Sequence, residues 1–119
     1  MTQKTYLSWD DVEHMLDEVV ARLPSGSHFT GVYGLPRGGL VPAVMLSHRL
    51  DIPLLAAASP GCLVLDDIVD SGITLKHYSD LGYKIAVLVY KFHRSEVRPD
   101  YSGLITNDPN WVVFPWEKK

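Results

Sequence analysis

The stretch that most constrains the fold of this chain is residues 62–75, which read Cys-Leu-Val-Leu-Asp-Asp-Ile-Val-Asp-Ser-Gly-Ile-Thr-Leu. It starts as a short apolar run suited to a fully buried strand and then breaks into carboxylates, a Ser-Gly turn and a threonine. This order predicts a strand, a loop and the start of a helix. In an open parallel sheet, ligands bind outside the carboxyl ends of such strands.

The loop that follows the strand predicts an anion site. It offers a row of backbone N–H groups, two hydroxyls and a glycine at the positive end of a helix dipole, from Asp70, Ser71, Gly72, Ile73 and Thr74. Asp66 and Asp67 stand at the predicted end of the strand, and carboxylates beside an anion site suit sugar hydroxyls or a divalent cation. The pattern indicates a phosphorylated sugar bound with metal, and an acidic surface turn is the alternative.

A second loop, Leu-Pro-Arg-Gly-Gly at residues 35–39, precedes an apolar helix expected at about residues 40–50. Gly38 and Gly39 would let the backbone approach a ligand closely, and the guanidinium of Arg37 suits phosphate oxygens. The loop therefore predicts a second anion site. The alternative is a plain strand-to-helix turn whose arginine points to solvent.

Length and composition limit the classes of protein to consider. A chain of 119 residues fits a single domain, predicted here as residues 1–119, and a net charge of −3 does not favour binding to nucleic acid or a membrane surface. No apolar run reaches the length of a membrane span and the N-terminal residues lack an apolar signal core, so a cytoplasmic location is expected. The single cysteine excludes an internal disulfide, and the five histidines show no zinc-ligand spacing.

Helical and strand patterns alternate along the chain. Ser8 and Asp11 indicate the start of an amphipathic helix that ends before Pro24, and strands are predicted at about 29–34, 51–58, from 62, and at 85–90. A short helix is expected from about residue 73, ending at Gly82. This alternation predicts an α/β fold with a mostly parallel central sheet and helices on both faces. The core would occupy about residues 1–92, and residues 93–119 would form a reduced hood.

Residues 64–74 resemble, without interruption, the phosphoribosyl-diphosphate (PRPP) signature of the type I phosphoribosyltransferases. Arg-Gly-Gly-Leu-Val-Pro, at residues 37–42, resembles the pyrophosphate loop of the bacterial xanthine-guanine branch, and this resemblance implies a cis peptide between Pro36 and Arg37. The resemblance implies a purine phosphoribosyltransferase that uses PRPP, Mg²⁺ and a 6-oxopurine (guanine, xanthine or hypoxanthine). It covers most of the chain.

The resemblance also implies roles for the PRPP-binding residues. The 5-phosphate would rest on the backbone of residues 70–74, the ribose hydroxyls on Asp66 and Asp67 directly or through Mg²⁺, and the pyrophosphate on Arg37, Gly38 and Gly39. Arg37 and the metal would stabilise the leaving group, and Asp70 would accept a proton near N7 of the base.

The base would be bound by three further residues. Lys91 follows a predicted strand, and the tail Trp-Val-Val-Phe-Pro-Trp-Glu at residues 111–117 is similar to the xanthine-guanine enzymes. Trp111 would stack on the purine, Lys91 would donate to its 6-oxo group and the Val112 backbone would read its edge. The alternative for the tail is a strand that caps the core.

One departure from the family stands out: only residues 59–61 separate two predicted strands where the family carries a long mobile lid. We expect a homodimer or higher homo-oligomer in which a neighbouring chain or residues 93–99 partly roof the pyrophosphate, and PRPP hydrolysis that competes with transfer. Two other functions stay open. One is a PRPP- or nucleotide-binding regulator with little turnover, and the other is a phosphate-binding protein like a response regulator.

Overall fold

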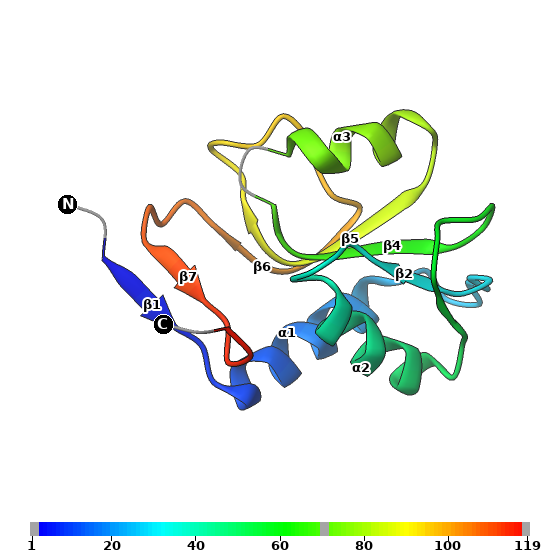
Figure 1. Ribbon diagram of the computed structural model, residues 1–119, viewed down its shortest axis with the longest axis horizontal. Helices are drawn as coiled ribbons and strands as arrows, with labels where there is room; N and C mark the ends of the chain where they lie inside the picture. Colours follow the sequence, from blue (N-terminus) through cyan, green and yellow to red (C-terminus); the bar gives the residue numbers. More distant parts are fainter. Residues whose placement is uncertain (1–2, 70–71, 118–119) are drawn as a thin grey trace.

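A computed structural model describes residues 3–69 and 72–117. Its centre is a five-stranded, fully parallel sheet in the order β3-β2-β4-β5-β6 (Figure 1). The strands are β2 (Val32–Gly34), β3 (Leu54–Leu55), β4 (Leu63–Val69), β5 (Lys84–Lys91) and β6 (Tyr101–Thr106). The predicted α/β fold with a parallel sheet is confirmed.

Helices cover both faces of the sheet, as expected. Helices α1 (Trp9–Arg22) and α2 (Leu40–Leu50) pack on one face, and α3 (Ile73–Asp80) packs on the other (Figure 1). Helix α1 begins at the predicted capping box, in which the Ser8 hydroxyl accepts from the Asp11 N–H and the Asp11 carboxylate accepts from the Ser8 N–H. Helix α3 ends next to Gly82, whose φ of 90° is the left-handed conformation expected after a helix.

Two predicted strands are much shorter in the structure. The strand expected at residues 29–34 is only β2, and the one expected at 51–58 is only β3, at the edge of the sheet. Pro53 and Pro60 flank β3 and lack backbone donors, and residues 56–62 turn back toward the start of β4. Propensity alone therefore overestimated these strands.

A second, two-stranded sheet joins the two ends of the described chain. Strand β1 (Lys4–Tyr6) pairs in parallel with β7 (Trp111–Val113), with Thr5 opposite Val112 (Figure 1). Sequence reasoning missed β1 because three residues are too few for a periodic pattern. It also placed β6 in the hood, whereas β6 is the edge strand of the central sheet.

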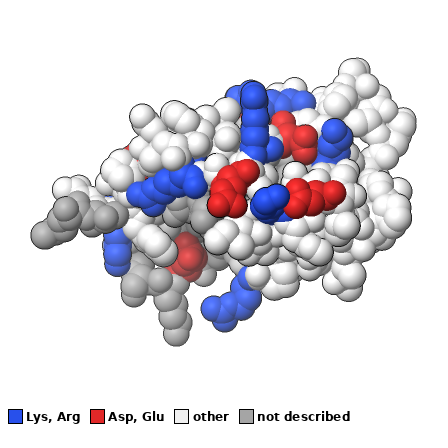
Figure 2. All heavy atoms as spheres, turned by 90° about the horizontal axis from the view of Figure 1, so that it is seen from above, with Lys and Arg blue, Asp and Glu red and all other residues white. Residues whose placement is uncertain are grey.

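The surface carries mixed charge. On the face seen in Figure 2, acidic and basic side chains alternate and neither sign gathers into a broad patch. None of the described helices is long and apolar enough to cross a membrane.

Candidate active site

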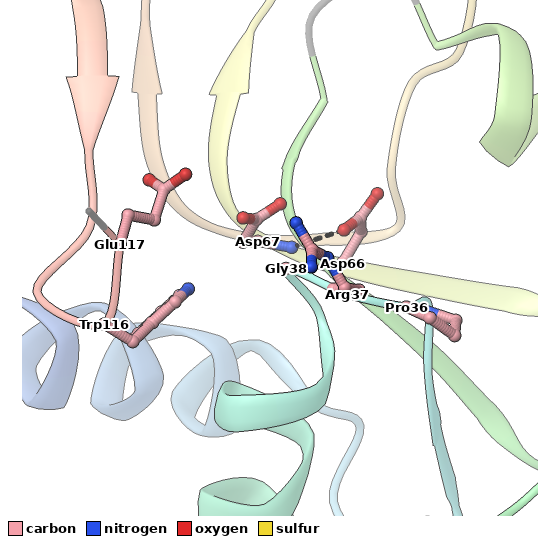
Figure 3. Close-up of a pocket in the computed structure, with 7 residues that line it drawn as sticks. All are labelled: Pro36, Arg37, Gly38, Asp66, Asp67, Trp116 and Glu117. Atoms are coloured by element: carbon pink, nitrogen blue, oxygen red, sulfur yellow. Dashed lines mark hydrogen bonds between the residues drawn. The ribbon is translucent and has the colours of Figure 1, made fainter. Parts of the chain in front are cut away.

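The main cavity, of about 760 Å³, lies where strand β2 ends beside the longer strand β4. It is lined by Pro36, Arg37, Gly38, Asp66, Asp67, Trp116 and Glu117 (Figure 3). Three segments distant in the sequence meet here: the loop after β2, the middle of β4, and the turn after β7. The two predicted anion-binding motifs are therefore neighbours.

Asp66 and Asp67 do not end their strand, as the sequence suggested, because β4 continues to Val69. Strand β2 pairs with β4 only as far as Leu65, whereas β5 continues alongside to Val69. The carboxylates therefore follow the point where β4 loses its neighbour on one side. Oδ1 of Asp66 accepts from the Asp67 N–H and Oδ1 of Asp67 from the Ile68 N–H, each at 2.8 Å.

The electrostatics of this pair favour a cationic ligand. Burial, together with the adjacent charge of Asp67, raises the pKa of Asp66 to about 8. Burial also raises the pKa of Asp67, and Glu117 adds to that effect by repulsion. Among the described residues neither aspartate forms a salt bridge with a lysine or arginine. The two carboxylates thus form an acidic centre that retains a proton near neutral pH unless a cation binds beside it.

Arg37 and Gly38 form the opposite wall. The Pro36–Arg37 peptide is cis, as the resemblance implied. The guanidinium of Arg37 is exposed and has no hydrogen bond or ion pair within the described parts of the chain, so it is free to meet an anion. It lies over the cavity, near both aspartates (Figure 3).

Gly39 has a structural role in this loop, and its predicted contact with pyrophosphate stays a prediction. Its N–H donates to the Leu35 carbonyl at 2.8 Å and it does not line the cavity. A Cβ at this position would come 2.5 Å from the Leu65 carbonyl oxygen. Gly39 thus allows the loop to pack against β4, and Gly38 presents the backbone to the ligand.

The predicted 5-phosphate loop borders a second cavity of about 190 Å³. It is lined by Asp66, Ile68, Val69, Gly72, Ile73, Thr74 and Leu75. Gly72 has a φ of 80°, and no side chain among residues 3–69 and 72–117 caps the N-terminus of α3, which leaves the first N–H groups of the helix for a ligand. Asp66 lines both cavities and so connects the two anion sites. Asp70 and Ser71 lie outside the described residues.

Residues 93–99 do not roof the pyrophosphate side, which corrects one of our predictions. Val97 is buried in the cluster on the α3 side, and Ser95 packs on Gly72, where a Cβ would lie 2.8 Å from the serine Oγ. This segment therefore supports the 5-phosphate loop. Trp116 and Glu117 wall the larger cavity instead, although neither was predicted as a site residue. Their position in the motif at residues 111–117 was the signal that could have identified them.

The short connection at residues 59–61 lies far from the cavity along β4. Thr30 holds it, with its N–H bonded to the Gly61 carbonyl at 3.0 Å and its hydroxyl to the Pro60 carbonyl at 3.1 Å. Thr30 precedes β2, so these contacts are at the amino end of the sheet. The connection therefore cannot close over the acidic pair at the other end.

The predicted base-binding residues lie together but outside the main cavity. The Nζ of Lys91 is buried and donates to the Asn110 carbonyl at 2.5 Å, directly before Trp111. Lys91 and Val112 line a separate cavity of about 50 Å³, room for one or two water molecules. Trp111 is 60% exposed. Its indole is thus accessible to a planar ligand, whereas Lys91 is engaged within the protein.

Comparisons with known proteins agree with this geometry. No protein-family model matches the chain. The chain is 29% identical to the xanthine-guanine phosphoribosyltransferase of Cereibacter sphaeroides, over 94% of this chain and 86% of that protein. It is 26% identical to the xanthine-guanine phosphoribosyltransferase of Desulfotalea psychrophila, over 97% of this chain and 88% of that protein. The crystal structure of a purine phosphoribosyltransferase from Pyrococcus horikoshii matches with a TM-score of 0.80 and 32% identity, over 98% of this chain and 95% of that one.

Proposed function

Because this chain belongs to the purine phosphoribosyltransferases of the type I family, we propose that it transfers the 5-phosphoribosyl group of PRPP to a 6-oxopurine and releases pyrophosphate. The observation that carries this proposal is the joining of two anion sites through Asp66, which lines both cavities. PRPP has the same layout: a 5-phosphate at one end, a pyrophosphate at the other and ribose hydroxyls between them.

In this proposal each part of PRPP has a binding surface. The 5-phosphate accepts hydrogen bonds from the first turn of α3, with Thr74 adding a hydroxyl, and the pyrophosphate lies against Arg37 and Gly38. Asp66 and Asp67 face the ribose hydroxyls between them. The roles of Asp70 and Ser71 remain predictions from the resemblance.

Mg²⁺ suits the acidic centre. Asp66 and Asp67 are hard oxygen ligands without a cationic partner in the described chain, and no three acidic, histidine or cysteine side chains there form a complete metal cage. Mg²⁺ is commonly bound by one or two carboxylates with substrate phosphates completing its coordination. When bound, the ion would neutralise charge that develops on the departing pyrophosphate.

The reaction forms one bond and breaks one bond at C1′ of the ribose. N9 of the purine attacks C1′, the bond from C1′ to the pyrophosphate oxygen breaks, and the electron pair leaves with pyrophosphate. Arg37 stabilises the negative charge on that leaving group, and the carboxylates stabilise the positive character of the ribose. The proton lost by the purine would pass to Asp70, in the role that the family resemblance gives it.

Recognition of a 6-oxopurine rests on Lys91, Trp111 and Val112. An ammonium group only donates hydrogen bonds, so it matches a 6-oxo group and would leave the 6-amino group of adenine unpaired, at a cost of about 1 to 3 kcal/mol. The bond from Lys91 to Asn110 must be exchanged or shared when the base binds. Trp111 offers an exposed ring for stacking.

The direct test is titration calorimetry with PRPP and MgCl₂, followed by assays of nucleotide and pyrophosphate formation with guanine, xanthine, hypoxanthine and adenine. We expect PRPP binding that needs both aspartates, and turnover with 6-oxopurines. Unchanged affinity in the Asp66→Asn, Asp67→Asn double variant would contradict the assigned site. Binding without turnover of any purine would contradict the enzymatic function and favour a regulator.

A further inference from the structure

Trp116 carries the unexplained polar group of this site. Its Nε1 is fully buried and has no hydrogen-bond partner in the described parts of the chain, while the residue lines the cavity that holds Arg37 and Asp67. An indole nitrogen can only donate, and a buried donor without an acceptor costs about 1 to 3 kcal/mol. The protein thus keeps a costly group at the wall of its principal cavity.

The ring is held firmly in this orientation. It stacks on Phe114, with centroids 4.9 Å apart and planes 11° from parallel, and contacts Trp9 at 5.8 Å. The following residue is also fixed, because the Glu117 carboxylate accepts from the Phe114 N–H at 2.8 Å. Figure 3 shows the indole nitrogen pointing from the C-terminal turn toward the Arg37 and Gly38 side of the cavity. The donor is therefore preorganised.

We propose that the indole N–H of Trp116 donates a hydrogen bond to an oxygen of the pyrophosphate group of PRPP, as a binding residue for the leaving group. The inference rests on the proposed function. Three features indicate a diphosphate oxygen as the acceptor. The indole N–H points toward the side of the cavity formed by Arg37 and Gly38. Among the described residues, the Arg37 guanidinium has no partner and the backbone N–H of Gly38 has no backbone acceptor. Nε1 is fully buried without ligand, so the proposal requires side chains at the cavity wall to move when the diphosphate binds.

The variant Trp116→Phe tests the donor while it keeps an aromatic ring against Phe114. We expect calorimetry to show about 10-fold weaker binding of PRPP and of inorganic pyrophosphate, both with MgCl₂. Binding of a purine nucleoside 5′-monophosphate, which lacks the diphosphate, should not change. Trp9→Phe is the matched control, since it removes an indole from the same aromatic cluster outside the cavity lining, and should bind all three ligands like the wild type.

Ligand dependence gives a second readout, because Trp116→Phe also leaves a small cavity that lowers the stability of the ligand-free protein whatever Nε1 does. Magnesium pyrophosphate should therefore raise the free energy of unfolding of the wild type more than that of Trp116→Phe. An equal increase in both proteins would overturn the proposal. Equal weakening of PRPP and nucleoside monophosphate binding would overturn it too, because the role would then be structural.

The wild-type protein provides a third readout, in which the variant serves only to assign a signal. The three tryptophans give three indole N–H signals in ¹H–¹⁵N spectra, and Trp116→Phe identifies one of them. Magnesium pyrophosphate should shift that signal downfield, and an unmoved signal at saturation would overturn the assignment. If the wild type binds no PRPP, the proposed function fails; if it binds PRPP and Trp116→Phe binds it equally well, only this inference fails.

Discussion

A Cβ atom at position 38 would lie 2.1 Å from Oδ2 of Asp67, so the backbone of Gly38 packs directly against that carboxylate. This contact joins the loop after β2 to the acidic pair on β4. It brings the surface proposed for pyrophosphate within reach of the groups proposed for ribose and metal. Gly38 and Asp67 are 29 positions apart in the sequence, and their two motifs act as one site because residue 38 has no side chain.

Gly38→Ala should therefore damage the site more than the fold. The methyl group must displace the Asp67 carboxylate or the loop, and we expect at least 10-fold weaker binding of PRPP by calorimetry with a modest loss of stability. In an Asp67→Ala background the clash is absent, so adding Gly38→Ala should cost little further stability. Equal destabilisation in both backgrounds would show that the loop, and not the carboxylate, resists the methyl group.

Without metal, the protein should lose stability as the pH rises. The pKa of Asp66 is about 8 in the folded protein, above its ordinary value of 3.8, so the folded state holds this proton more tightly than the unfolded state. The contribution of the bound proton is complete below pH 4 and is lost as the pH rises toward 8. Asp66→Asn should raise the free energy of unfolding at pH 8 by roughly 1 to 3 kcal/mol and flatten the profile.

Urea unfolding at pH 5 and pH 8 in EDTA measures this effect. Glu96→Gln, at an exposed position, is the matched control and should follow the wild-type profile. The same Asp66→Asn variant should bind PRPP and Mg²⁺ more weakly, because it loses the charge that a metal or ribose would use. A variant less stable than the wild type at pH 8 would mean that the Asp66 carboxylate is stabilised by a partner.

Replacing Lys91 should change base selectivity without changing PRPP affinity. Lys91→Met keeps the length of the buried stem and removes the donor, so we expect kcat/KM for guanine to fall at least 10-fold and the preference over adenine to shrink. The Kd for PRPP should stay within about twofold of the wild type. Retained selectivity in Lys91→Met would remove this residue from base recognition.

The open cavity should permit hydrolysis of PRPP without a purine. The connection at residues 59–61 is held at the amino end of the sheet by Thr30, so no lid from this segment excludes water. We expect pyrophosphate release from PRPP and MgCl₂ alone, slower than release with a 6-oxopurine. Sedimentation at the same protein concentration tests the expected homodimer. A monomer that transfers the phosphoribosyl group efficiently without hydrolysing PRPP would show that the site needs neither a lid nor a second subunit to exclude water.

The sequence by itself determined the fold class, the positions of the three helices and the two anion motifs. These features depend on local chemistry: the capping box at Ser8, the positive φ of Gly72 and Gly82, and the apolar runs of β4 and β5. Each is decided by neighbours within a few residues, which a linear pattern records. The family resemblance at residues 64–74 added the expected ligand.

Only the tertiary structure decided which strands are long, which segments wall the cavity and where the charged groups find partners. Strand β1 exists because β7 offers it a backbone ladder, and Lys91 is engaged because Asn110 lies beside it. Trp116 entered the site because the turn after β7 folds against the loop at Arg37, far away in the sequence. Such contacts depend on the packing of distant elements, and the order of the residues does not record that packing.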